Sequence, residues 1–127
     1  GSSPWPLPPG PRYIDIEAGE VLPEVLDAAG IQACVLIGHA DGSTIALRYA
    51  ALQPPLLRAV VAIAPQAIRE PRTLASLERA QAAFSTTDLR ARLARYHGAN
   101  VDAAFRIWND AWLTPGFDPL EADRRLP

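Results

Sequence analysis

The apolar positions in the first quarter of the chain recur at helical spacing. Over 18–29 they stand three or four residues apart, and Gly30 follows as a candidate C-terminal cap. We therefore predict a helix over 18–29, in which Pro23 forces a kink or a late start. Five prolines within 4–11 fix the backbone and remove donors, so residues 1–17 are predicted to form a leading loop.

Two runs indicate strands: residues 33–37, which are all apolar, and residues 57–64, in which Arg58 is the one charged residue. Neither run alternates with polar residues, which is typical of strands covered on both faces. A helical pattern over 43–52 lies between them and ends before Pro54. Strand, helix and strand in this order predict parallel strands joined by a right-handed crossover. Because two parallel strands do not form a stable sheet, the chain is interpreted as the middle of a larger α/β sheet.

Three further helices are predicted in the second half, over 72–84, from 86–88 to His97, and over 101–113. One broad face of the last helix is predicted to be apolar, and its members are Ala103, Ala104, Ile107, Trp108, Ala111 and Trp112. The organisation expected is a leading loop over 1–17, a βαβ core over 18–68 and a helical segment over 69–127, in one incomplete domain.

Composition and charge exclude several classes of function. The chain has 127 residues, 49% of them hydrophobic, and a net charge of −2, which favours neither nucleic acid nor a membrane surface as a partner. No apolar run approaches the roughly 18 residues of a membrane span. One cysteine, Cys34, forms no internal disulfide or zinc cluster, and no phosphate or dinucleotide motif is present, so no metal and no cofactor are expected. Without a visible signal peptide, a cytoplasmic location is expected, and arginine in place of lysine favours a bacterial source.

The segment Gly38-His39-Ala40-Asp41-Gly42 falls between a predicted strand and a predicted helix. This context matches the G-x-S-x-G nucleophile elbow, in which a strained middle residue presents its side chain above the sheet. The flanking glycines let strand and helix approach closely. The helix directs its N-terminal N–H groups at the reacting centre, and the N–H of Asp41 would form half of an oxyanion hole.

With this elbow, the chain resembles the α/β-hydrolase superfamily over nearly all of its length. The resemblance rests on the helix and elbow in 20–42, the continuation over 44–54, the strand that ends at Pro65, and the segment 86–113. It implies a fragment of the α/β-hydrolase fold, in which a parallel strand–elbow–helix–strand unit is followed by a helical lid. The parent activity implied is serine-type hydrolysis of a carboxylic ester or related acyl substrate, without a cofactor.

The chain departs from the family at the elbow, where Ala40 occupies the position of the nucleophilic serine. A methyl group cannot attack a carbonyl, and the catalytic acid and histidine that the family places later are expected to be absent. The chain is therefore predicted to be inactive, as a natural pseudoenzyme or through an engineered Ser→Ala change. The alternative is a non-catalytic interaction module that pairs through strand edges with its own copy or with a complementary chain.

The candidate catalytic positions are Ala40 and Asp41, the latter through its backbone N–H. Candidate substrate contacts are His39, His97, Trp108 and Trp112. Each has a structural alternative: His39 is expected to pack beneath the elbow, His97 to cap a helix, and the two tryptophans to fill the lid core as readily as to wall an acyl pocket. Ser43 lies too far along its helix to replace the nucleophile. Three arginines, Arg90, Arg92 and Arg95, are expected to form a solvated face.

Overall fold

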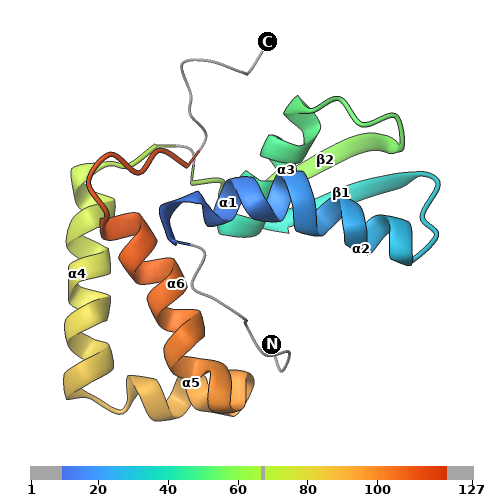
Figure 1. Cartoon of the computed structure of the whole chain (residues 1–127). Coiled ribbons are helices and arrows are strands. Elements are labelled where there is room, and N and C mark those ends of the chain that lie inside the picture. Colours follow the sequence, from blue (N-terminus) through green and yellow to red (C-terminus); the bar gives the residue numbers. More distant parts are fainter. Residues whose placement is uncertain (1–9, 67, 120–127) are drawn as a thin grey trace. The chain divides into compact units, whose positions relative to one another are not determined.

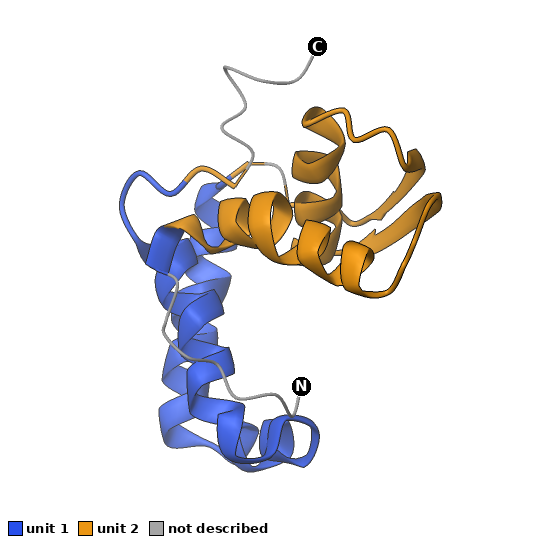
Figure 2. Ribbon diagram, turned by 45° about the vertical axis from the view of Figure 1, so that its right-hand side comes forward, with its two compact units in different colours: residues 1–11, 69–117 blue, residues 12–68, 118–127 orange. Residues whose placement is uncertain are grey.

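The computed structural model describes residues 10–66 and 68–119, and these residues form two compact units (Figure 2). We call the unit of residues 12–68, with which 118–119 are grouped, the elbow unit. We call the unit of residues 69–117, with which 10–11 are grouped, the helical unit. No helix in the described ranges is both long and apolar enough to cross a membrane.

The elbow unit contains three helical segments, two strands and the helix that connects the strands (Figure 1). In chain order they are α1 (Tyr13–Ile16), the π-helical turn η2 (Glu17–Val21), α2 (Leu22–Ala28), β1 (Cys34–His39), α3 (Asp41–Ala51) and β2 (Leu57–Ile63). A short 3-10 turn, η1 (Gly10–Arg12), precedes α1.

Helix begins at Tyr13 in the structure, within the segment that the prolines predict to be a loop. The last of these prolines is Pro11, so the residues after it are free to form a helix. The buried side chains of this helical segment include Tyr13, Ile14 and Ala18. Pro23 is tolerated because it lies in the first turn of α2, directly after the π-helical turn.

The end of α2 follows the prediction. Gly30 has a φ of +67°, and its N–H donates to the carbonyl of Asp27 at 2.8 Å. The N–H of Ile31 donates to the carbonyl of Leu26 at 2.9 Å, which completes a glycine cap of the Schellman type.

The strands β1 and β2 pair in parallel, as predicted, and α3 packs on one face of the pair (Figure 1). Cys34 is paired with Leu57, the register shifts once, and the pairing continues from Val35 opposite Ala59 to His39 opposite Ile63. The core of this unit lies between α2, α3 and the sheet. It consists of Ala18, Leu26 and Tyr49, against which Leu22, Cys34, Leu36, Ile45, Leu56 and Leu57 pack.

The prediction that both faces of the strands are covered is wrong for the described residues. Val35 is 54% exposed, Ile37 72%, Val61 46% and Ile63 48%, all on the face away from α3. Side chains alternate between the two faces of a strand, and α3 covers only one of them. In β1, exposed residues therefore alternate with residues that are at least partly buried.

The helical unit contains α4 (Pro71–Thr86), α5 (Leu89–His97), the 3-10 turn η3 (Gly98–Asn100) and α6 (Val101–Leu113). Helix α6 has the bounds that the sequence predicts. Helices α4 and α6 lie side by side (Figure 1). At the end of α6, Arg69 donates to the carbonyls of Trp112 at 2.8 Å and Leu113 at 3.0 Å, which satisfies two acceptors that the helix leaves open.

The buried face of α6 is rotated from the predicted one. Its buried residues are Val101, Phe105, Asn109, Ala111 and Trp112, whereas Ala103 is exposed. The rotation brings Asn109 into the interior, where its side-chain N–H donates to the carbonyl of Leu77 in α4 at 2.9 Å. Apolar content alone did not predict this face, because a polar side chain occupies its centre.

Candidate active site

The elbow is a single residue, Ala40, between the end of β1 and the start of α3. Ala40 has φ 50° and ψ −122°, a backbone conformation that L-residues rarely adopt. Such a conformation costs about 1–3 kcal/mol and persists only where the surroundings enforce it. A sharp strand-to-helix turn with a strained residue at its tip is the geometry predicted from the sequence.

Hydrogen bonds to the backbone of Ala40 enforce this conformation. Its N–H donates to the carbonyl of Ile63 in β2 at 3.0 Å. Its carbonyl accepts the N–H of Ser43 at 3.0 Å and the N–H of Thr44 at 3.2 Å. The Ser43 hydroxyl also donates to that carbonyl, at 2.6 Å. Strand and helix thus hold the tip residue from both sides.

The two glycines of the motif differ in their surroundings. Gly38 is buried, and a Cβ there would collide with the backbone of Gly42 and Ser43. Gly42 has open space where its Cβ would be. Only the first glycine is therefore required for the close approach of β1 and α3.

Asp41, the first residue of α3, is tied to α1. The Tyr13 hydroxyl donates a hydrogen bond to its carboxylate, and Asp15 of α1 forms an ion pair with Arg48 of α3. The backbone N–H of Asp41 lies in the first turn, where a helix offers no intrahelical acceptor. Its carboxylate is thus engaged with Tyr13, and its N–H belongs to the first turn of α3, directly after the strained residue Ala40.

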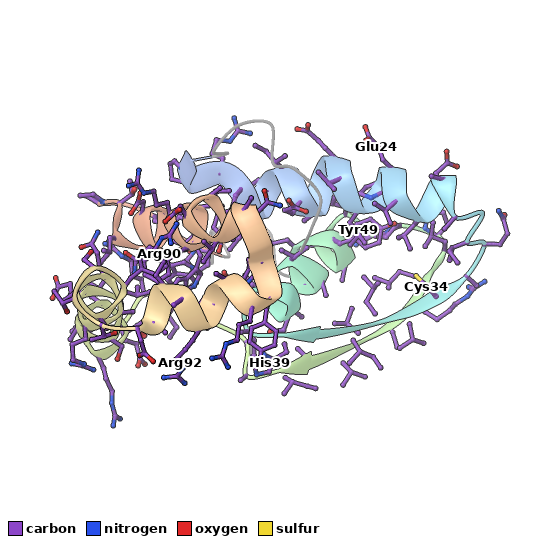
Figure 3. All side chains as sticks on the ribbon, turned by 90° about the horizontal axis from the view of Figure 1, so that it is seen from below. Glu24, Cys34, His39, Tyr49, Arg90 and Arg92 are labelled. Atoms are coloured by element: carbon purple, nitrogen blue, oxygen red, sulfur yellow. The ribbon has the colours of Figure 1, made fainter. Side chains whose placement is uncertain are left out.

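Ser43 is fully buried, and its hydroxyl contacts the carbonyls of Ala40 and Ile63, the latter at 3.3 Å. Its exclusion as a replacement nucleophile agrees with this burial. His39 differs from its expectation, because it is exposed rather than packed beneath the elbow (Figure 3). It follows Gly38 on β1, so its side chain lies on the sheet face away from α3.

The other candidate substrate contacts belong to the helical unit. His97 is the last residue of α5 and is half-buried. Trp112 is fully buried, and its ring meets the edge of Phe117 at a centroid distance of 5.0 Å. Trp108 is half-buried and lies edge-on to Phe105 at 5.7 Å. Packing in the interior accounts for Trp112, whereas Trp108 keeps an accessible surface.

Burial shifts two ionisable groups of the elbow unit. Desolvation raises the pKa of Glu17 in the π-helical turn. Desolvation, with a smaller effect from the neighbouring Cys34, raises the pKa of Tyr49 (Figure 3). Neither group lies on the elbow motif, and the turn η2 that carries Glu17 packs on helix α3.

Two side-chain interactions in the structure were not predicted from the sequence. The Tyr13–Asp41 hydrogen bond joins residues 28 positions apart and requires the helix to begin before the predicted start. Arg90, expected on a solvated face, is held by Asp102 through two hydrogen bonds, of 2.8 Å and 2.5 Å. Helix α5 folds back onto α6 and brings these two charges together, which no local pattern indicates.

Within the described part of the chain, no three His, Cys, Asp or Glu side chains gather as a metal site. Residues 1–112 match the family described as alpha/beta hydrolase fold. A putative carbamate hydrolase, RutD of Stutzerimonas stutzeri, is 46% identical over 61 residues, which is 48% of this chain and 22% of the relative. The chain thus matches less than a quarter of that protein's length. No solved structure matches the chain significantly.

Proposed function

This chain belongs to the alpha/beta hydrolase fold family, and from that premise we propose that it carries the elbow and lid of an acyl hydrolase without the nucleophile. The observation that carries the proposal is the backbone of Ala40, held at φ 50° and ψ −122° between β1 and α3. A strained turn of this kind serves to present a side chain at the N-terminus of a helix. The helical unit takes the role of the lid.

In the parent reaction, a nucleophile at position 40 attacks the acyl carbon and a tetrahedral oxyanion forms. The N–H of Asp41 and the positive end of α3 supply part of the stabilisation of that oxyanion. Ala40 has no atom that can form the acyl intermediate, and Ser43 cannot replace it because its hydroxyl is buried and bonded. The chain as it stands therefore forms no acyl-enzyme.

The relative named as a putative carbamate hydrolase supports the substrate class that we propose. A carbamate is an acyl compound whose carbonyl carbon bears both nitrogen and oxygen. Attack on it passes through the same tetrahedral oxyanion as ester hydrolysis, so one elbow serves both. We propose carbamates and short carboxylic esters as the substrates of the parent enzyme.

The test compares the full-length protein with its Ala40→Ser variant on p-nitrophenyl acetate and p-nitrophenyl N-methylcarbamate. The unsubstituted protein is expected to release nitrophenol no faster than buffer and to gain no acyl mass. Ala40→Ser is expected to gain a covalent acyl adduct at residue 40, whereas turnover also needs the acid and histidine that are expected to be absent from this chain. An acyl adduct on the unsubstituted protein would contradict its inactivity. If the Ala40→Ser variant reacts with no member of a broad panel of acyl substrates, the proposed parent activity would be wrong.

A second candidate function rests on the bare face of the sheet. Val35, Ile37, Val61 and Ile63 expose apolar surface, and neither strand has another partner among the described residues. Open strand edges pair readily with another chain. An interaction module would form a homo-oligomer or bind a complementary chain through these strand edges, and the partner would also cover the apolar face. Light scattering after size exclusion tests it: a folded monomer at all concentrations would exclude self-pairing.

A further inference from the structure

The elbow unit contains a pocket of about 340 Å³ at the end of its sheet that lies opposite the elbow. The lining consists of Pro23 and Asp27 of α2, Ile31 and Gln32 before β1, Tyr49 of α3, and Pro55 and Leu56 before β2. The two loops of this lining lead into the starts of the strands, whereas Ala40 follows the end of β1. The volume lies within the range of sites that bind small molecules.

Tyr49 brings a buried polar group to this pocket. The residue is 3% exposed and belongs to the core between α2, α3 and the sheet. Its hydroxyl forms no hydrogen bond with another described residue, and it is not among the partnerless polar atoms that are sealed from solvent. The small accessible part of Tyr49 in the pocket therefore includes the hydroxyl. Desolvation raises the pKa of Tyr49, so the hydroxyl stays neutral at neutral pH and offers lone pairs to a donor.

The charge of the pocket is negative. Asp27 is the one charged residue of the lining, and it forms no ion pair with any residue that the structure describes. The segment 13–38, which includes Asp27, contains no lysine or arginine, and its acidic residues are Asp15, Glu17, Glu20, Glu24 and Asp27. Arg48 of α3 pairs with Asp15, and Arg58 of β2 is exposed and lies outside the lining. The carboxylate of Asp27 is therefore without a basic partner in the pocket.

Two helix ends increase the preference for a positive charge. Helix α2 ends at Ala28 and helix α3 at Ala51, directly after the lining residues Asp27 and Tyr49 or within one turn of them. The carboxyl end of a helix carries a partial negative charge, which attracts cations. Most of the lining is apolar, and within the described ranges no three side chains gather to hold a metal ion. An organic cation therefore suits the pocket better than an anion or a metal ion.

We propose that this pocket binds a small organic monocation with an apolar body. Its ammonium group donates to the hydroxyl of Tyr49 and to the carboxylate of Asp27, and its hydrocarbon part lies on the prolines and aliphatic side chains of the lining. One carboxylate matches one positive charge. The proposal is independent of the proposed hydrolase function, since no lining residue belongs to the elbow motif.

The experiment titrates the full chain at neutral pH with cyclohexylamine, which is then protonated, and measures binding by calorimetry and by saturation-transfer NMR. Two probes control for its parts: cyclohexanecarboxylate keeps the ring but reverses the charge, and methylamine keeps the charge without the ring. Cyclohexylamine is expected to bind saturably at one site, with each control probe at least about tenfold weaker. Absence of saturable binding, or equal binding of the carboxylate, would overturn the proposal.

Variants locate the site. Tyr49→Phe keeps the buried ring and removes a hydroxyl that has no partner in the described chain, so the fold should persist while cyclohexylamine binds at least about tenfold more weakly. Asp27→Asn is expected to weaken binding about threefold, because its carboxylate is exposed.

Glu24→Gln is the matched control. It removes a negative charge from the same helix at an exposed residue outside the lining, whose side chain points away from Tyr49 (Figure 3), and it should leave the affinity unchanged. Circular dichroism checks that all three variants keep their helices. Equal losses in Asp27→Asn and Glu24→Gln, or undiminished binding by a folded Tyr49→Phe, would contradict the assignment.

Discussion

A Cβ on Gly38 would lie 2.5 Å from the carbonyl carbon of Gly42, so strand β1 and helix α3 touch where residue 38 has no side chain. No side-chain adjustment relieves this contact, because its partner is backbone. Gly38→Ala is therefore expected to lower the free energy of unfolding of the elbow unit by about 3 kcal/mol. Amide hydrogen exchange of β1 and β2 measures that change.

Gly42→Ala is the matched control within the same motif. Its Cβ meets open space in the first turn of α3, where alanine favours helix over glycine by about 1 kcal/mol. Exchange from β1 and β2 should thus slow slightly or stay the same. If both variants destabilised the unit equally, the close approach of strand and helix at Gly38 would be wrong.

The bond between Tyr13 and Asp41 predicts a second stability effect. Tyr13→Phe removes the hydroxyl that donates to the Asp41 carboxylate but keeps the buried ring. Because loss of a hydrogen bond to a charged group costs about 1.5–3 kcal/mol, the free energy of unfolding should fall by that amount. Chemical denaturation measures the change. Tyr96→Phe, at a side chain that is 79% exposed, should cost nothing measurable. Equal effects would show that the bond contributes nothing.

Glu17 gives the elbow unit a pH dependence. Its desolvation raises the pKa above the ordinary value of 4.5, so the folded state binds the proton more tightly than the unfolded state. The contribution of protonated Glu17 to the free energy of unfolding is fully present below pH 4.5 and is lost as the pH rises through the raised pKa. Glu17→Gln should therefore stabilise the unit at neutral pH but not at a pH below the ordinary pKa.

Denaturation of Glu17→Gln at several pH values checks this sign. Glu24→Gln, at an exposed residue of α2, serves as the control and should leave the pH profile unchanged. A Glu17→Gln profile that runs parallel to that of the unsubstituted chain would contradict the burial of this carboxyl.

The buried side chain of Asn109 is predicted to stabilise the packing of α4 against α6. Its side chain is fully buried and donates to the Leu77 carbonyl at 2.9 Å. Asn109→Ala removes this hydrogen bond between the two helices and opens a small cavity, at a cost of about 2–4 kcal/mol. Exchange from α4 and α6 should accelerate accordingly. Ala103→Gln, at an exposed site on the same helix, should not accelerate it.

Sequence reasoning succeeded where the signal is local. The elbow, the Gly30 cap and the bounds of α6 depend on a few neighbouring residues whose backbone preferences are strong. It failed where the answer depends on distant packing. The apolar strand β1 contains nothing that says only one of its faces is covered, and the exposure of Ile37 became visible only in three dimensions.

The candidate site divides in the same way. The turn at Ala40 was predicted from its spacing, because a strand-to-helix turn restricts the residues it accepts, whereas the catalytic roles of Ala40 and Asp41 stay predictions. The partners of the site were not found, since Tyr13 reaches Asp41 through the docking of α1 on α3. The pairing of Arg90 with Asp102 likewise depends on how α5 folds onto α6.

The strained elbow is tested most directly by Ala40→Gly. Glycine adopts the backbone angles of residue 40 without the strain that a Cβ adds, about 1–3 kcal/mol, although it loses more chain entropy on folding. The account predicts a rise of about 1 kcal/mol in the free energy of unfolding, whereas Ala50→Gly inside α3 should lower it by about the same amount. A fall for Ala40→Gly as large as that for Ala50→Gly would contradict the elbow.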